Sequence, residues 1–491
     1  MKRRLGPVLP AMAAALFAAC VGTPNVAGVP GASPAPEKPW TPPASERKAI
    51  TPADTSTQAA VPPDLADRIR RLTLAEIVDL GLRNNAQTRL AWANAQTAAA
   101  AYGSARGEWL PSIDADVTAQ RVKTVASAGR IGVEQSVLTP SATLSYLLFD
   151  FGGRSGRVAG ARERLIAAGF SHNAAIQDVV LQIQIGYFQY IATRSLLSAQ
   201  RTTFAEAQAN LEAAEERRRV GLATIADVLQ ARTAASQAQL DLQSTEGSLQ
   251  TSRGGLALAL GLPANLPYDV DSSAAAMSVA PLADSVDALI ASALQGRPDL
   301  AAAQAEAAAA RAGIGELKSD LLPSLQLSAT GGRTYATTIP NGANSYNLLL
   351  GLSIPIFNGF SRQYDLRGAR FEAEAADART RTLRQQVVYQ VFSAYYALQT
   401  ATRRVRTADV LIASAEQSSE VALARYKAGV GSVLDLLSAQ SALANARAQR
   451  VDARLAWSVS FARLAHDAGV LDPRGENPLR LTSDTTTVTP R

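Results

Sequence analysis

The chain has 491 residues and a net charge of +6, with 47% apolar, 5% aromatic and 18% charged residues. Alanine dominates the apolar share, and because alanine favours helices and lets them approach closely, long packed helices are expected. The arginines are scattered with no basic-aromatic module, which favours a solvated helix surface over nucleic-acid binding. One cysteine and two widely separated histidines exclude a disulfide framework and a Cys/His metal site.

The first predicted element is a secretory signal that ends at the single cysteine. Basic residues at 2–4 precede a short apolar stretch at 5–17, and two alanines then lead into Cys20. This pattern resembles a bacterial lipoprotein signal, although Phe17 stands where leucine is usual. Residues 1–19 are therefore expected to be a lipoprotein signal peptide and Cys20 a lipidation site that anchors the chain. A buried structural cysteine is the alternative.

Two segments lack hydrophobic periodicity. Residues 20–70 are rich in Pro, Ala, Thr and Ser, which predicts a Pro-rich tether, and residues 471–491 are expected to form a disordered tail. No run of about 20 apolar residues follows residue 20, so no transmembrane helix is predicted. A membrane-spanning part would have to be a barrel.

Between these segments the chain contains the same pattern twice, at 71–270 and 271–470. A Leu-Pro-Ser motif at 110–112 recurs 212 residues later, and the Val-Gly pair at 220–221 matches the Ala-Gly pair 208 residues later. A repeat of this length indicates a duplicated subdomain and not a short solenoid unit. Each copy begins with a predicted helix, over 76–108 and 288–320, the second interrupted by Pro298.

Each repeat then predicts a β-hairpin, at 112–150 and 324–357, because apolar residues alternate with mostly polar ones. Each strand has about 10 residues or slightly more, the length that crosses a bilayer as a tilted barrel strand. An ordinary soluble sheet packed on a helix is the alternative. Four strands cannot close a water-filled barrel and three chains of four strands can, so a homotrimer is expected.

A long helical hairpin completes each repeat, at 154–260 and 362–469. Apolar residues follow spacings of three and four, and a helix over 154–219 would extend about 100 Å. His172 falls on this apolar seam, where a packed histidine is favoured over a ligand. The same packing role is expected for four tyrosines: Tyr187, Tyr190, Tyr395 and Tyr396.

The order of these elements resembles the TolC-like outer membrane factors over about 70–470. The shared motifs are Asn84-Asn85, the Arg-Pro-Asp-Leu segment at 297–300, the two Leu-Pro-Ser motifs, and two Gly turns followed by Asp-Val-Leu and Asp-Leu-Leu. The resemblance implies a mixed α and β fold: a trimeric 12-stranded transmembrane β-barrel continued by a long α-helical coiled-coil tunnel in the periplasm. It also implies no cofactor, no bound metal and no catalysis, with a periplasmic adaptor (membrane fusion protein) and an inner-membrane pump as partners.

The resemblance also places a gate at the tip of the tunnel. Asp227 matches a position that latches the first hairpin to the second, and Tyr426 matches a position that receives such a link. The basic latch partner would fall at Gly431, which cannot serve. The acidic pore-lining pair would be Asp435 and Ser438, so one carboxylate is left and only a light latch is expected. A helix-capping role is the alternative for both aspartates.

Adaptor docking is expected at the two turns, by the same resemblance. These turns comprise Val220, Gly221, Leu222, Ala428, Gly429 and Val430. Arg217–Arg219 lie beside the first turn, where a solvated helix end is favoured over an adaptor contact.

Several functions remain open. The cargo could be drugs or metals moved by a proton-driven (RND-type) pump, or a protein moved by type I secretion with an ABC transporter. The expected lipidated N-terminus and Pro-rich tether resemble the drug-efflux members of the family more, so efflux is preferred. A non-conducting coiled-coil envelope scaffold is the alternative from another class. A secreted enzyme is disfavoured because the sequence has no clustered catalytic constellation or nucleophile motif.

Overall fold

A computed structural model describes residues 35–41, 72–125, 132–264, 268–271, 279, 282–337 and 339–471. The signal peptide, the lipidation site Cys20 and the tail beyond Leu471 lie outside the described residues. Of the expected tether, only 35–41 is described.

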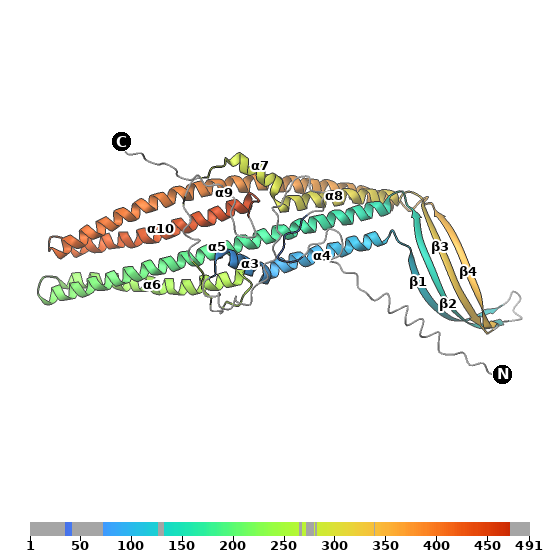
Figure 1. Ribbon diagram of the computed structural model, residues 1–491, viewed down its shortest axis with the longest axis horizontal. Coiled ribbons are helices and arrows are strands. Elements are labelled where there is room, and N and C mark those ends of the chain that lie inside the picture. The colour runs from blue at the N-terminus through green and yellow to red at the C-terminus, as the bar shows by residue number, and fades with distance from the viewer. Residues whose placement is uncertain are drawn as a thin grey trace. The chain divides into compact units, whose positions relative to one another are not determined.

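The helices and strands follow the duplicated order that the sequence predicts (Figure 1). In chain order they are α3 (Leu74–Asn84), α4 (Ala86–Gly107), β1 (Ser112–Val125), β2 (Gly132–Phe149), α5 (Gly153–Arg219), α6 (Ile225–Ala259), α7 (Val286–Gly296), α8 (Pro298–Ser319), β3 (Ser324–Ala336), β4 (Ile339–Ser353), α9 (Ser361–Lys427) and α10 (Val433–Asp467). The long helices match one to one, because α5 and α9 each have 67 residues and α6 and α10 each have 35. Corresponding residues of the two helical hairpins are therefore separated by 208 positions.

Some boundaries differ from the sequence prediction, whereas the interruption expected at Pro298 is present. The first helix, expected to run over 76–108, is broken at Asn85, whose extended backbone (φ −69°, ψ 128°) separates α3 from α4. The matching break in the second repeat is at Arg297, directly before Pro298. Strand β4 ends at Ser353 and not at 357, and Pro355, which has no N–H to donate to a neighbouring strand, lies in the missing stretch.

The chain forms two compact units. The first contains the sheet with the adjoining helical segments, 94–169 and 304–377, and the second contains 35–93, 170–303 and 378–471. The sheet is wholly antiparallel in the order β1-β2-β3-β4, with Ser112 paired to Ser145 and Ser324 to Ser353. Both outer strands, β1 and β4, have one partner each within the described chain, so each leaves a row of backbone groups unpaired.

Apolar side chains are exposed along β4. Tyr346, Leu348, Leu350 and Leu352 alternate along the strand, and between 61% and 93% of each is exposed. A soluble sheet would bury such a face against a helix, because monomeric soluble proteins rarely expose large contiguous apolar patches. This observation argues against the alternative of an ordinary soluble sheet.

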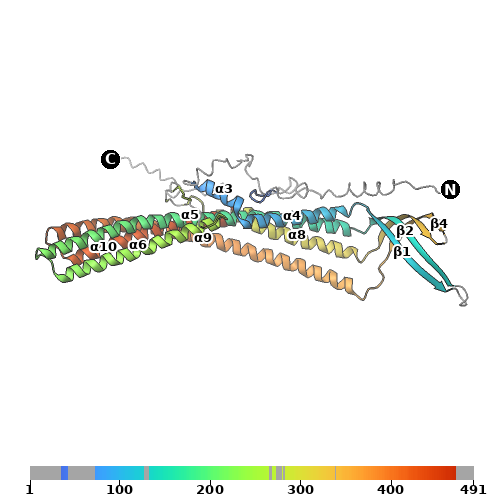
Figure 2. The same ribbon diagram turned by 90° about the horizontal axis from the view of Figure 1, so that it is seen from below.

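The second unit is built on two helical hairpins, α5 with α6 and α9 with α10, which both views place side by side (Figures 1 and 2). A single apolar core joins them with α3 and α7. Trp457 is 2% exposed and stacks on Phe461 with ring centroids 5.4 Å apart. Burial of each such side chain contributes roughly 1.5–3 kcal/mol. No helix in the described ranges is long and apolar enough to cross a membrane.

The residues predicted to pack on the helical seam divide into two groups. His172 is fully buried, and Tyr187 and Tyr190 are 0% and 6% exposed, so these three predictions are confirmed. Tyr395 is partly buried against the core. Tyr396 is 45% exposed, and its ring contacts the rings of Phe392 and Tyr395 at centroid distances of 4.8 and 5.3 Å.

Candidate functional site

The two hairpin turns expose apolar side chains. Gly221 and Gly429 have left-handed backbone angles (φ 79° and 76°), which glycine adopts without steric cost and which reverse the chain after α5 and α9. Val220, Leu222 and Val430 are then 64%, 71% and 69% exposed. These side chains suit a docking partner that covers apolar surface.

Both aspartates of the predicted gate cap the N-terminus of a helix. Asp227 accepts hydrogen bonds from the backbone N–H (2.8 Å) and hydroxyl (2.9 Å) of Thr224. Ser432 makes the same kind of capping box with Asp435 at the start of α10. Capping is the alternative role that the sequence offers for both residues. Asp435 is exposed at the tip and Asp227 is half-buried. Ser438, one turn after Asp435, is also exposed.

Tyr426 receives a link from the first hairpin, but from Arg217 and not from Asp227. The Arg217 guanidinium donates to the Tyr426 carbonyl oxygen at 2.7 Å and lies 4.5 Å from the centre of the tyrosine ring. Within the described part of one chain, the hydrogen bonds of the Asp227 side chain go to Thr224, and it forms none with the second hairpin. Gly431 packs against the backbone of Arg425 and Tyr426 and has no side chain to form a latch. The Arg217 side chain therefore contacts the second hairpin, whereas the sequence favours a solvated helix end at this position.

Two further contacts join α5 to α10, and both lie farther from the turns than this link. Arg447 of α10 forms a two-pronged ion pair with Glu206 of α5, with both N–O distances 3.0 Å. Asn210 of α5 donates to Gln440 of α10 at 2.6 Å. We call these two contacts and the Arg217–Tyr426 link the inter-hairpin ladder. The ladder connects the hairpins with one charged, one amide and one cation–π rung.

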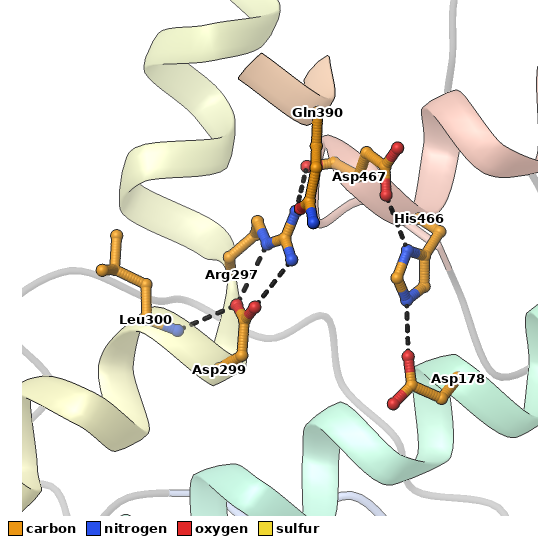
Figure 3. Close-up of polar contacts among 7 residues, drawn as sticks. All are labelled: Asp178, Arg297, Asp299, Leu300, Gln390, His466 and Asp467. Carbon is orange, nitrogen blue, oxygen red and sulfur yellow. Dashed lines mark hydrogen bonds and ion pairs between the residues drawn. The ribbon is translucent and has the colours of Figure 1, made fainter. Parts of the chain in front are cut away.

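At the helix breaks, each repeat ties its first helix to the end of its return helix. Asn85 donates to the carbonyl oxygen of Ala259 at 3.0 Å, near the end of α6. Arg297, its counterpart 212 residues later, donates to the carbonyl oxygen of Asp467 at 3.3 Å, at the end of α10. Figure 3 shows Arg297 also bonded to Asp299 and Gln390. Burial alone would raise the pKa of Asp299, but the bonds and charge of Arg297 lower it.

His466 lies beside this junction, between two carboxylates. Its ring nitrogens are 2.9 Å from Asp178 of α5 and 3.0 Å from Asp467 (Figure 3). Burial opposes the charged ring, but the two carboxylate hydrogen bonds outweigh burial and raise the pKa of His466 to about 9. The sequence predicts no role for this histidine, because Asp178 is 288 residues away.

Part of the predicted tether is fixed to α5. Trp40 is 2% exposed and meets Phe170 edge-on with centroids 5.1 Å apart. The Asn173 side chain accepts from the Trp40 N–H at 2.6 Å and donates to its carbonyl oxygen at 2.7 Å. The His172 ring nitrogen Nε2 lies 2.8 Å from the carbonyl oxygen of Pro36, and burial lowers the pKa of this histidine. We call residues 35–41 on α5 the N-terminal clip.

Comparison with known proteins gives one consistent family. The model of the outer membrane efflux protein family matches residues 77–262 and 289–470. Protein CyaE of Bordetella pertussis is 31% identical over 84% of this chain and 86% of its own length. The antibiotic efflux pump outer membrane protein ArpC of Pseudomonas putida is 24% identical over 88% and 90%. The structure of the CmeC outer membrane channel of Campylobacter jejuni superposes with a TM-score of 0.74 at 19% identity, covering 86% of this chain and 91% of that one.

Proposed function

This chain belongs to the outer membrane efflux protein family, and from that membership we propose that three copies form a passive exit duct through the outer membrane. The protein is an outer-membrane channel with the TolC-like fold and a periplasmic extension. In the proposed assembly, four strands from each copy close a 12-stranded barrel, and the helical hairpins of the three copies surround a tunnel. The duct needs no cofactor and catalyses no reaction.

The observation that carries this proposal is the four-stranded sheet with two unpaired edges and an exposed apolar face. Backbone groups left unpaired in lipid cost several kcal/mol each, so such a sheet must pair its edges with other strands. Because the two edge strands differ, β1 of one copy can pair with β4 of the next, which generates a closed ring.

The exposed face of α9 supports the same assembly. Tyr389, Phe392 and Tyr396 are 71%, 48% and 45% exposed. Their counterparts 208 residues earlier in α5 lie against the core: Leu181 is partly buried, and Gln184 and Phe188 are 3% and 7% exposed. The first repeat thus covers a helix face that the second repeat leaves open. A second copy of the chain would cover it.

The proposed partners are a periplasmic adaptor and an energy-consuming inner-membrane pump. Relatives named as efflux pump components support efflux over type I secretion. We propose an RND-type pump in preference to an ABC transporter, and docking of the adaptor on the turns at 220–222 and 428–430. Lipidation of Cys20 would anchor each chain to the outer membrane in addition to the barrel. Mass spectrometry of the purified protein would detect the lipid mass on Cys20.

Single-channel recording tests the proposal against the scaffold alternative. The full-length protein, purified in detergent and added to a planar lipid bilayer, should produce discrete conductance steps. Its mass by light scattering should correspond to three chains. A non-conducting scaffold would give no steps at any voltage, and that result would overturn the exit-duct proposal.

A further inference from the structure

The four-stranded sheet has one apolar face. Its strand register pairs Ile113 with Leu144, Leu144 with Ala329 and Ala329 with Leu348, so these four side chains form one row across the sheet. Residues two positions apart in a strand point to the same side, which puts the other apolar residues of each strand on this face as well. The opposite face carries the polar side chains, among them Asp114 and Thr143.

The apolar face ends in basic residues. On β1, Ile113 and Val117 are each 71% exposed, and the same face continues with Arg121 and Lys123, which are also exposed. Strand β1 follows α4 and β2 leads into α5, so the turn between them lies at the end of the sheet away from these helices (Figure 1). Arg121 and Lys123 are therefore close to that far end.

The second repeat places an arginine at the matching position. Arg333 is the counterpart of Arg121, 212 positions later in the chain. It is the next residue after Gly331 on the apolar face of β3, as Arg121 is the next after Ala119 on β1. In both repeats, the first side chain beyond the apolar run is thus a guanidinium.

The Arg333 side chain is held in position by its own hairpin. Its guanidinium donates to the carbonyl oxygen of Asn341 at 2.7 Å and lies 5.4 Å from the centre of the Tyr335 ring. Gly342 has a left-handed backbone (φ 70°), and a Cβ atom there would lie 2.8 Å from Arg333 Nε and 2.7 Å from the Tyr335 ring. The glycine therefore leaves the space that both side chains occupy. A side chain that is already ordered loses less entropy when it binds a ligand.

Positive charge is in excess at this end of the apolar face. Glu134 of β2 is its one acidic side chain within the described strands, and it pairs with Arg121 at 2.7 Å. Lys123 and Arg333 form no ion pair with any described residue. An anion would balance these two charges.

Two tyrosines mark the level of the membrane at which the basic residues lie. Tyr346 of β4 is 93% exposed and Tyr335 of β3 is 37% exposed, next to Arg333 on the same face. Tyrosine rings gather where a membrane-spanning sheet meets the lipid headgroups. Because the helical extension is periplasmic, the end of the sheet away from the helices lies in the outer leaflet. This placement rests on the proposed barrel, with its apolar face toward lipid.

We propose that Arg121, Lys123 and Arg333, which we call the basic rim, bind the phosphate groups of a glycolipid in the outer leaflet. The fork of an arginine matches two phosphate oxygens, and lysine adds a point charge. Three basic side chains against one carboxylate favour a headgroup with two phosphates over a headgroup with one. The acyl chains of the same lipid would lie along the apolar rows below the rim.

Native mass spectrometry of the full-length trimer, titrated in detergent with bisphosphorylated lipid A, measures this binding. Monophosphorylated lipid A should bind more weakly, and zwitterionic phosphatidylethanolamine more weakly still. Lys123→Gln and Arg333→Gln should each lower the affinity for bisphosphorylated lipid A roughly fivefold, the effect of one basic residue near an anionic lipid surface. Glu134→Gln removes the one carboxylate and should raise the affinity by a similar factor. A damaged fold would not give such a gain.

A matched control separates the basic rim from the overall charge of the protein. Lys318→Gln removes an exposed basic residue at the end of α8, where the sheet joins the helices, and should leave the affinity unchanged. Inorganic phosphate at the concentration of the lipid should not displace it, because free phosphate makes no contact with the apolar rows.

The outcomes distinguish this inference from the proposed function. Equal affinity for lipid A with two phosphates and for phosphatidylethanolamine, in a wild type that conducts, would overturn the basic rim as a phosphate site and leave the exit duct intact. An equal loss in Lys318→Gln and Arg333→Gln would overturn the placement of the site at the rim. A wild type that forms no trimer and gives no conductance would instead refute the proposed function.

Discussion

His466 is the residue whose charge most clearly depends on the fold. Its pKa rises from 6.5 to about 9, so the folded protein binds a proton that the unfolded chain releases between these values. The stabilisation is fully present below pH 6.5 and is lost as pH rises through about 9. Asp178 is 59% exposed, so we expect the contribution to be only about 1–2 kcal/mol.

Denaturation midpoints of the wild type and of His466→Gln, compared from pH 5.5 to 9.5, would measure this effect. The difference between the two proteins should narrow as pH rises from 6.5 to 9.5. His172→Gln is a matched control of opposite sign, because burial lowers the pKa of His172 and its neutral form is favoured. A difference for His466→Gln that does not vary with pH would contradict the prediction.

Asp435 can be tested as a pore residue separately from its capping role. Asp435→Asn removes the charge but keeps an oxygen that can accept from the Ser432 N–H, so the start of α10 should persist. If three Asp435 carboxylates line the constriction, this variant should reduce the preference for cations over anions, measured as a reversal potential in a salt gradient. Asp227→Asn alters the equivalent box in the first hairpin and should change selectivity less. Equal permeability ratios in wild type and Asp435→Asn would remove Asp435 from the pore.

Side-chain roles at the tip could be predicted from the sequence only in part. The capping boxes of Asp227 and Asp435 are local patterns of four residues, and the sequence predicts helix capping as the alternative role for both aspartates. The Arg217–Tyr426 link joins residues 209 positions apart. Among three consecutive arginines at 217–219, periodicity alone does not determine which one points toward the second hairpin.

At the scale of the elements, the N-terminal clip holds the short segment 35–41 against the long helix α5. Asn173→Ala removes both hydrogen bonds to the Trp40 backbone, which together contribute roughly 1–3 kcal/mol. The Trp40–Thr41 bond should then become accessible, and chymotrypsin should cut there faster than in the wild type. Gln177→Ala, one turn further along α5, is the matched control, because the side chain of Gln177 makes no hydrogen bond within the described residues. Equal cleavage rates in the two variants would show that Asn173 does not hold the segment.

Long elements were predictable because their ends carry strong local signals. The hairpins expected at 154–260 and 362–469 occupy 153–259 and 361–467, since glycine turns and a helix stop mark their limits. The clip was not predictable, because a Pro-rich segment has no periodicity and the positions that hold it, His172 and Asn173, are more than 130 residues away. Composition alone favours a free tether there.

At the scale of the whole molecule, assembly depends on the open face of α9. Phe392→Arg places a charge on a face that the proposed trimer covers, and an unpaired buried charge costs several kcal/mol. The variant should therefore fold but dissociate, with a mass of one chain by light scattering in detergent where the wild type has three. Circular dichroism should remain strongly helical, because Phe392 is 48% exposed in the single chain.

Leu222→Arg is the matched control for this assembly test. Leu222 is 71% exposed, but it lies at the turn between α5 and α6 and not on the α9 face. The same charge there should leave three chains together, while any partner that docks on the turn should bind less tightly. If Phe392→Arg also remained trimeric, α9 would not be covered by a neighbouring copy. The match between the exposed face of α9 and the buried face of α5 would then need a different occupant, such as the adaptor.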